Sequence, residues 1–121
     1  MQVPDFLLRK LYRKGSLREV GSDHFAFELR NVLGTATIVK PPVMVVNGIG
    51  HRPEDVDIGR FALEKVSEES PWVFAKGDEV TVRLKGHLLK AGNRIHVLAR
   101  TKEFGDIEIL VEDRAATPVE Q

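Results

Sequence analysis

The chain has 121 residues, with 18 Lys and Arg, 18 Asp and Glu, and no Cys. The length suits one domain, and the lack of Cys excludes disulfides, thiolate metal sites and a cysteine nucleophile. A net charge of zero argues against a dedicated nucleic-acid-binding domain, because such domains are usually strongly basic. Charged residues make up 30% of the chain and there are only three Asn and two Met, a composition typical of thermophilic proteins.

The start of the chain and its longest apolar run bear on its location. Residues 1–14 contain too short an apolar stretch for a secretion signal, and charged residues interrupt it. The longest uncharged apolar run, residues 41–49, is far shorter than the ~20 residues of a membrane-spanning helix. We therefore expect a cytoplasmic protein.

The N-terminal part of the chain is predicted to hold one short helix and then strands. An early Pro can begin a helix over about residues 4–12. The β-branched and aromatic residues that follow favour strands over residues 17–20, 25–29, 36–39 and 43–46. Two successive Pro residues separate the last two strands, because Pro cannot donate to a β-ladder.

The middle of the chain mixes turn, strand and helix signals. Asn47–Gly48 is a turn sequence, and residues 56–58 could form a short strand after it. Residues 60–69 could hold two or three helical turns. Pro71 would end this helix, because the residue before a Pro resists the helical region.

The C-terminal part has the clearest strand pattern. Apolar and polar residues alternate over residues 80–85, 95–101 and 107–112, which indicates strands with one buried and one solvated face. Turn-like residues at 90–93 and 103–106 connect them. We expect a three-stranded antiparallel meander of two successive hairpins.

Together these elements predict an all-β fold. The expected architecture is an antiparallel two-sheet sandwich or a small barrel of about 7–8 strands, with one or two short helices. A single β domain should span residues 1–114, and residues 115–121 should form a flexible tail.

One group of residues could support metal or acid–base chemistry: His51, Asp55 and Asp57. An imidazole and two carboxylates can hold a divalent metal or act as acid and base, and alternate residues of an extended segment point the same way. The spacing matches no zinc or calcium signature, so ordinary turn chemistry is the alternative. A divalent metal is therefore a candidate cofactor but not a favoured one.

Two aromatic residues, Trp72 and Phe74, are candidates for a ligand-binding or interface role. They follow a Pro and precede the strand predicted from residue 80. Aromatic side chains in such a position can line a pocket, or they can close the core.

The polar side of the predicted meander carries cations that could bind an anion. This set comprises Arg83, Lys85, Arg94, His96 and Arg100. The next strand offers Glu108 and Glu112 as cross-strand partners, and there is no exposed aromatic residue to stack on bases. A solvent face laced with salt bridges is therefore favoured over an anion-binding face.

Charge is distributed unevenly along the chain. Residues 1–20 hold five cations and two anions (+3), whereas residues 53–79 hold three cations and eight anions (−5). Complementary patches can meet within one chain or between two, and in the second case they favour self-association.

The functional expectation follows from these patterns. The chain contains no G-x-S-x-G, H-E-x-x-H or Walker motif. We expect a non-enzymatic soluble β-sandwich that acts through homo-oligomeric association or as an accessory or scaffold module. The alternatives are a small-molecule or metal-binding protein or enzyme that uses His51, Asp55 and Asp57, and a weak nucleic-acid binder.

Overall fold

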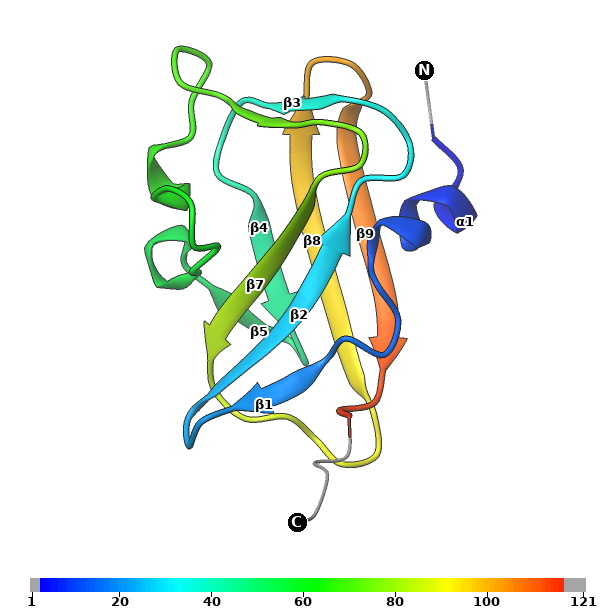
Figure 1. Ribbon diagram of the computed structural model, residues 1–121, viewed down its shortest axis with the longest axis vertical. Coiled ribbons are helices and arrows are strands. Elements are labelled where there is room, and N and C mark those ends of the chain that lie inside the picture. The colour runs from blue at the N-terminus through cyan, green and yellow to red at the C-terminus, as the bar shows by residue number, and fades with distance from the viewer. Residues whose placement is uncertain (1–2, 117–121) are drawn as a thin grey trace.

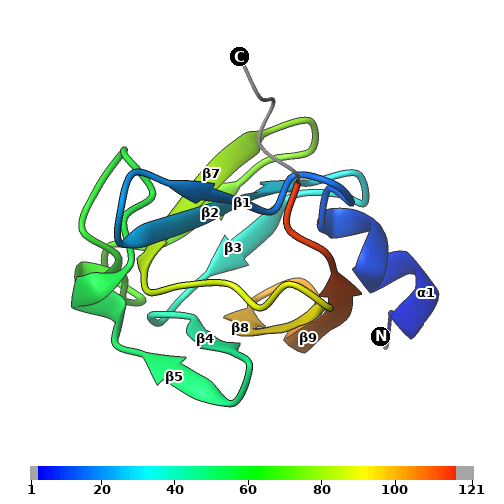
Figure 2. The same cartoon turned by 90° about the horizontal axis from the view of Figure 1, so that it is seen from below.

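A computed structural model describes residues 3–116 as two antiparallel sheets packed face to face, which confirms the expected all-β sandwich (Figures 1 and 2). The smaller sheet has the order β1-β2-β7, with strands Arg18–Val20, His24–Arg30 and Glu79–Lys85. The larger sheet has the order β5-β4-β8-β3-β6, with β9 also paired to β8. Its strands are β3 (Ala36–Ile38), β4 (Val43–Val46), β5 (Ile49–His51), β6 (Trp72–Phe74), β8 (Asn93–Thr101) and β9 (Gly105–Asp113).

Cross-strand apolar pairs hold the smaller sheet against the core. Buried and exposed residues alternate strictly along β7, so one side of the strand faces inward. The register with β2 sets Phe25 opposite Leu84 and Phe27 opposite Val82. All four side chains are buried, and such same-face pairs stabilise antiparallel sheets.

The long strand β8 organises the larger sheet. It pairs along its whole length with β9 on one side. On the other side it pairs first with β4 and then, through Thr101, with β3. The inward residues Ile95 and Val97 pack into the core, so the alternate residues of β8 form part of the outer face of the molecule.

The two sheets are also joined at their edges. The main chain of Asp57 exchanges two hydrogen bonds with Arg83 of β7, at N–O distances of 3.0 and 2.8 Å. At the opposite side, the N of Ala116 donates to the O of Leu17, just before β1, over 2.7 Å. The short helix α1 (Asp5–Leu8) and the 3-10 helix η1 (Arg9–Leu11) lie beside β9, as Figure 2 shows for α1.

Two buried asparagines tie loops to strands. The side chain of Asn31 donates to the O of Gly34 and the O of Phe74, both at 2.7 Å, and accepts from two main-chain N–H groups. Asn93 exchanges hydrogen bonds with the main chain of Leu89. Because both amides are almost fully buried, these bonds satisfy groups that would otherwise destabilise the fold.

A two-residue turn connects β4 to β5. Asn47 and Gly48 have φ angles of 54° and 79°, the two positive values that a type I′ hairpin turn requires. The Asn47 side chain accepts from the N of Arg94 and donates to Oδ1 of Asn93, each over 2.9 Å. The predicted turn is therefore confirmed.

Two local predictions are wrong. The β8–β9 hairpin forms as expected, but β7 pairs with β2 in the other sheet and not with β8, so there is no three-stranded meander. Residues 60–69 do not form a helix of two or three turns; the segment contains one 3-10 turn, η3 (Leu63–Lys65). Another 3-10 turn, η2 (Pro53–Asp55), follows β5.

The ends of the chain agree with the sequence where the structure describes them. The helical segment expected near residues 4–12 is present as α1 and η1. Most of the predicted tail, residues 117–121, lies outside the described residues, as do residues 1–2. Within residues 3–116, no helix combines the length and apolar character needed to cross a membrane.

Candidate functional site

The three candidate metal or catalytic residues are not gathered into one site. His51 ends β5, and its ring packs edge-on against Phe25 with the centroids 6.0 Å apart. Burial lowers the pKa of His51, an effect that the Asp55 carboxylate opposes. Oδ2 of Asp55 lies 3.1 Å from Nε of Arg52, and Oδ1 of Asp57 accepts from the N of Gly59 at 2.8 Å.

These contacts correct the geometric expectation for the metal site. The two carboxylates were expected on one side of an extended segment, but Asp55 belongs to the 3-10 turn η2. Among residues 3–116, no three His, Asp or Glu side chains are placed to share a metal ion. The carboxylates serve turn and ion-pair chemistry, and binding of a metal stays a prediction without a preformed ligand set.

The aromatic pair is part of the core. Trp72 and Phe74 are both buried on β6, with their ring centroids 5.1 Å apart, and Phe61 packs on Trp72 at 5.7 Å. They line an apolar cavity of about 40 Å³ between the sheets. Pockets for drug-sized ligands are typically about 300–1,000 Å³, so this cavity is much smaller than such a pocket, and ligand binding by the two aromatic residues stays a prediction.

The predicted anion-binding residues are divided between the two sheets. Arg83 and Lys85 lie on β7, whereas Arg94, His96 and Arg100 lie on β8. The five side chains therefore do not form one basic face.

The β8 cations have acidic partners on β9, which supports the salt-bridged alternative. Arg94 lies 3.4 Å from Glu112, and Nε of Arg100 lies 2.9 Å from Oδ1 of Asp106. The Arg100–Asp106 hydrogen bond and charge raise the pKa of Arg100 and lower that of Asp106.

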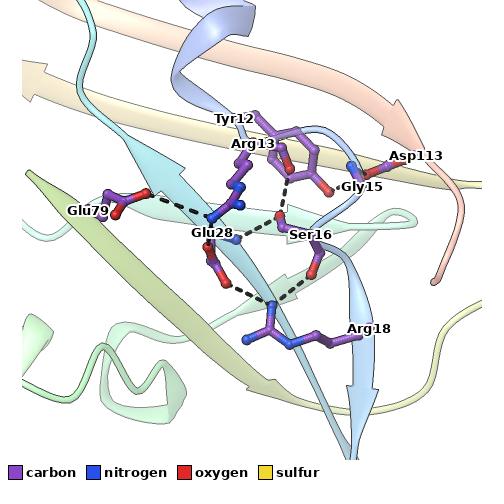
Figure 3. Close-up of polar contacts among 8 residues, drawn as sticks. All are labelled: Tyr12, Arg13, Gly15, Ser16, Arg18, Glu28, Glu79 and Asp113. Carbon is purple, nitrogen blue, oxygen red and sulfur yellow. Dashed lines mark hydrogen bonds and ion pairs between the residues drawn. The ribbon is translucent and has the colours of Figure 1, made fainter. Parts of the chain in front are cut away.

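The basic N-terminal segment is partly neutralised within the chain (Figure 3). Arg13 and Arg18 lie 2.8 and 3.3 Å from the carboxylate of Glu28, and Arg13 lies 3.8 Å from that of Glu79. Ser16 links the same segment to β2, because its hydroxyl accepts from the N of Glu28. These contacts attach residues 13–18 to the small sheet.

A buried clamp joins the two ends of the domain. The hydroxyl of Tyr12 and the N of Gly15 both donate to Oδ2 of Asp113, each at 2.8 Å (Figure 3). Burial, together with the hydrogen bond to and charge of Asp113, raises the pKa of Tyr12 well above its ordinary value. The phenol therefore stays protonated and fixes the segment before β1 to the end of β9.

The outer face of the β4–β8–β9 sheet carries an unusual number of apolar side chains. The strand register sets Val45, His96 and Leu110 in one row, and Val43, Leu98 and Glu108 in the next. We call Val43, Val45, Leu98 and Leu110 the outer apolar patch. Val43 is 51% exposed and Leu110 is 47% exposed, although the outer face of a solvated antiparallel sheet is usually polar.

His96 stands in the middle of this patch. Its side chain is 29% exposed, but the Nε2 atom itself has no solvent contact. Nε2 lies 3.2 Å from Oε1 of Glu108, yet the geometry does not satisfy a hydrogen bond. The two side chains are in contact without a hydrogen bond, so Nε2 is an unsatisfied polar atom among the side chains of the outer apolar patch.

Charged pairs border the patch along the strands. Arg94 and Glu112 face each other at one end, and Arg100 and Asp106 face each other at the other end. These two rows are six residues apart, which corresponds to about 20 Å along a strand. An apolar centre with a polar rim is the usual anatomy of a protein–protein interface.

The alternation of apolar and polar residues predicts a polar outer face here, and this prediction does not include the outer apolar patch. The signal was present: the residues that alternate with the core positions of β8 and β9 include Leu98 and Leu110. What the pattern could not show was that β4 would bring Val43 and Val45 alongside them.

Comparison with protein families identifies the family of the chain. The family described as "Hydroxymethylglutaryl-CoA reductase, N-terminal domain" matches residues 7–116. The chain belongs to this family. Comparisons with curated proteins and with solved structures gave no match.

The family match covers every strand of the sandwich and the clamp between Tyr12 and Asp113. In this chain, the region that matches the family is a β-sandwich in which the segment before β1 is fixed to the end of β9.

Proposed function

We propose that this chain is a non-catalytic association domain of a hydroxymethylglutaryl-CoA reductase and that the outer apolar patch is its docking surface. One observation carries the proposal: beside His96 and Glu108, two adjacent rows of a regular sheet hold four apolar side chains on the outer face, two exposed and two half-buried, between two rows of ion pairs. The family assignment supports a role beside the catalytic part of the reductase.

Exposure of the outer apolar patch to water has a free-energy cost. Exposed apolar area is unfavourable by roughly 25 cal/mol per Å², and a contiguous patch can recover this energy when a partner covers it. The ion pairs at the rim are exposed and contribute little to the stability of the domain itself. They are well placed to set the orientation of a partner.

These 121 residues contain no Cys, so a thiol introduced here is unique within them, and any Cys elsewhere in the full-length protein would first be replaced by Ser. We would make Val43→Cys on the patch and Val73→Cys on β6 as its matched control. The two valines are similarly exposed, at 51% and 54%, but Val73 lies away from the patch. Maleimide labelling would be timed on the full-length reductase protein as purified.

The expected result is at least about tenfold slower labelling of the Val43→Cys variant than of the Val73→Cys variant, because a partner surface covers the patch. In denaturant both variants should label at the same rate. Equal labelling in the native full-length protein would refute the proposal, because the patch would then be open to solvent in the working molecule.

A further inference from the structure

We propose that the partner on the outer apolar patch is a second copy of this chain, related by a two-fold axis that runs parallel to the strands between β8 and β9. This inference rests on the proposed function and adds the identity and orientation of the partner. It follows from the register of charges on the outer face and from the shape of the surface beside β9.

The register gives four rows of outward side chains on the β8–β9 pair. Arg94 is opposite Glu112, His96 opposite Leu110, Leu98 opposite Glu108, and Arg100 opposite Asp106. Rotation about an axis between the two strands exchanges the β8 and β9 columns but leaves each row at the same height. Arg94 then faces Glu112 of the second copy, and Arg100 faces Asp106 of the second copy.

The other simple two-fold axes give the opposite result. An axis across the strands would set Arg94 over Arg100 and Glu112 over Asp106, so all the outer contacts would be between like charges. An axis along β8 would set Arg94 over Arg94 of the second copy. Because like charges across an interface cost several kcal/mol, the charge pattern selects the axis between β8 and β9.

The surface beside β9 has room for the β4 strand of the second copy. With sheets about 10 Å apart and strands about 4.8 Å apart, the rotation carries β4 to a position just beyond β9. Two hollows lie there, between β9 and the N-terminal segment. One, of about 600 Å³, is lined by Tyr12, Leu110 and Val111 together with four charged residues (Arg9, Lys14, Arg94 and Glu112). The other, of about 520 Å³, is lined by Val3, Leu8, Phe104 and Ile107 together with three acidic residues (Asp5, Asp106 and Glu108).

Val43 and Val45 of the second copy would project toward these hollows. Each patch would thus be covered partly by the partner's β8–β9 pair and partly by the groove along the edge of β9. The two sheets would pack in the aligned manner, with strands crossing at about 30°, and long Arg and Glu side chains can span the gap at both rims. Each interface would contain the same contacts twice, as a two-fold axis requires.

Charge reversal separates contacts between copies from those within one chain. Arg94→Glu and Glu112→Arg would each set two like-charge contacts across the interface, so each variant alone should dissociate at least about a hundredfold more readily than the unaltered chain. An equimolar mixture of the two variants restores both contacts between opposite charges. Sedimentation velocity should therefore show dimers in the mixture and monomers in each component.

The matched control is a mixture of Arg100→Glu with Glu112→Arg. Its components carry the same net charges, but Glu112→Arg would face Arg94 of the other chain, and Arg100→Glu would face Asp106. This mixture should stay monomeric. Arg94 and Glu112 are 67% and 74% exposed, so folding should survive each change, which thermal unfolding would verify.

Each outcome decides one question. Dimers in the first mixture and not in the control support the proposed axis. Equal association of both mixtures, or of neither while the unaltered chain is dimeric, overturns it. If the unaltered chain is monomeric at all concentrations but the Val43→Cys variant is protected in the full-length protein, the partner is another protein. The second-copy inference then fails while the proposed function stands.

Discussion

Removal of the Tyr12 hydroxyl tests how much its hydrogen bond to Asp113 contributes to the free energy of unfolding. Tyr12→Phe keeps the ring, whose centroid lies 5.7 Å from that of Phe27, and deletes only the donor to Asp113. Hydrogen bonds to charged groups contribute about 1.5–3 kcal/mol. Because Gly15 and Arg114 still donate to the carboxylate, the loss should fall in this range and not above it.

The assay is urea unfolding at pH 7, followed by the fluorescence of the single tryptophan, which is buried on β6. A loss of about 1.5–3 kcal/mol corresponds to a decrease of roughly 5–15 °C in Tm for a domain of this size. Phe27→Leu removes the ring that packs against Tyr12 but leaves the Tyr12 hydroxyl in place. It therefore shows the effect of lost packing alone.

Alkaline pH gives the same contact an independent signature. The pKa of Tyr12 is higher in the folded state than the value of about 10 expected in the unfolded chain, so the unfolded state releases this proton first. Stability from this group is complete below pH 10 and falls above it, by up to about 1.4 kcal/mol per pH unit. The Tyr12→Phe variant should lack this component.

The chain has only one Tyr, so phenolate absorbance reports on Tyr12 alone. A native phenol that titrates near pH 10, together with a Tyr12→Phe variant within about 0.5 kcal/mol of the parent, would refute the hydrogen bond to Asp113 and the reasoning built on it.

Three further outcomes are expected. Asn31→Asp should destabilise the domain by about 3–5 kcal/mol in urea, because it replaces the donor to the O of Gly34 and of Phe74 with an oxygen; a loss below about 1 kcal/mol would contradict the buried network. Gly34→Ala should raise stability by about 0.4–1 kcal/mol, because Ala lowers the conformational entropy of the unfolded chain and its methyl fits at an ordinary contact distance of 3.9 Å from the Phe104 ring; a decrease in Tm would show that the loop cannot accept it. Burial lowers the pKa of His51, so stability present above pH 6.5 should be lost as the pH falls below 6.5; His51→Phe should remove that dependence, and an unchanged pH profile would count against the burial of the ring.

The inward side of most strands could be predicted, but strand partners could not. Alternation along β7 and β8 correctly indicated which residues are buried, because the period of two follows from local backbone geometry. It does not indicate which strand lies alongside. Gly86, with a φ of 136°, follows β7 directly, and residues 86–92 carry the chain to the other sheet.

The helix predicted over residues 60–69 is replaced by a single 3-10 turn, and the reason is also local. Leu63 and Val66 are the buried residues between 60 and 69, and their spacing of three suits a single 3-10 turn. The backbones of Ala62 and Val66 are extended, so the helix does not continue on either side. Three-residue strands such as β5 and β6 give almost no periodic signal, which is why residues 3–116 contain nine strands and not the expected seven or eight.

The arrangement of the candidate site residues could not be predicted for the opposite reason, because it depends on contacts between residues far apart in the sequence. The pairing of β4 with β8 created the outer apolar patch, and the separation of β7 from β8 divided the expected basic face. No local pattern around Arg83 or Arg94 could reveal either outcome, since each depends on which sheet a strand joins.

The turn at Asn47–Gly48 has a sequence that is prone to slow deamidation. In Asn–Gly sequences the main-chain nitrogen of the glycine can attack the side-chain carbonyl carbon of the asparagine and expel ammonia, and water then opens the resulting cyclic imide to give a carboxylate. Here both ends of the Asn47 amide are held, one by Asn93 and the other by the main chain of Arg94. This reaction should therefore proceed only when the β4–β5 hairpin opens, and the new negative charge would appear beside Arg94, at the rim of the outer apolar patch.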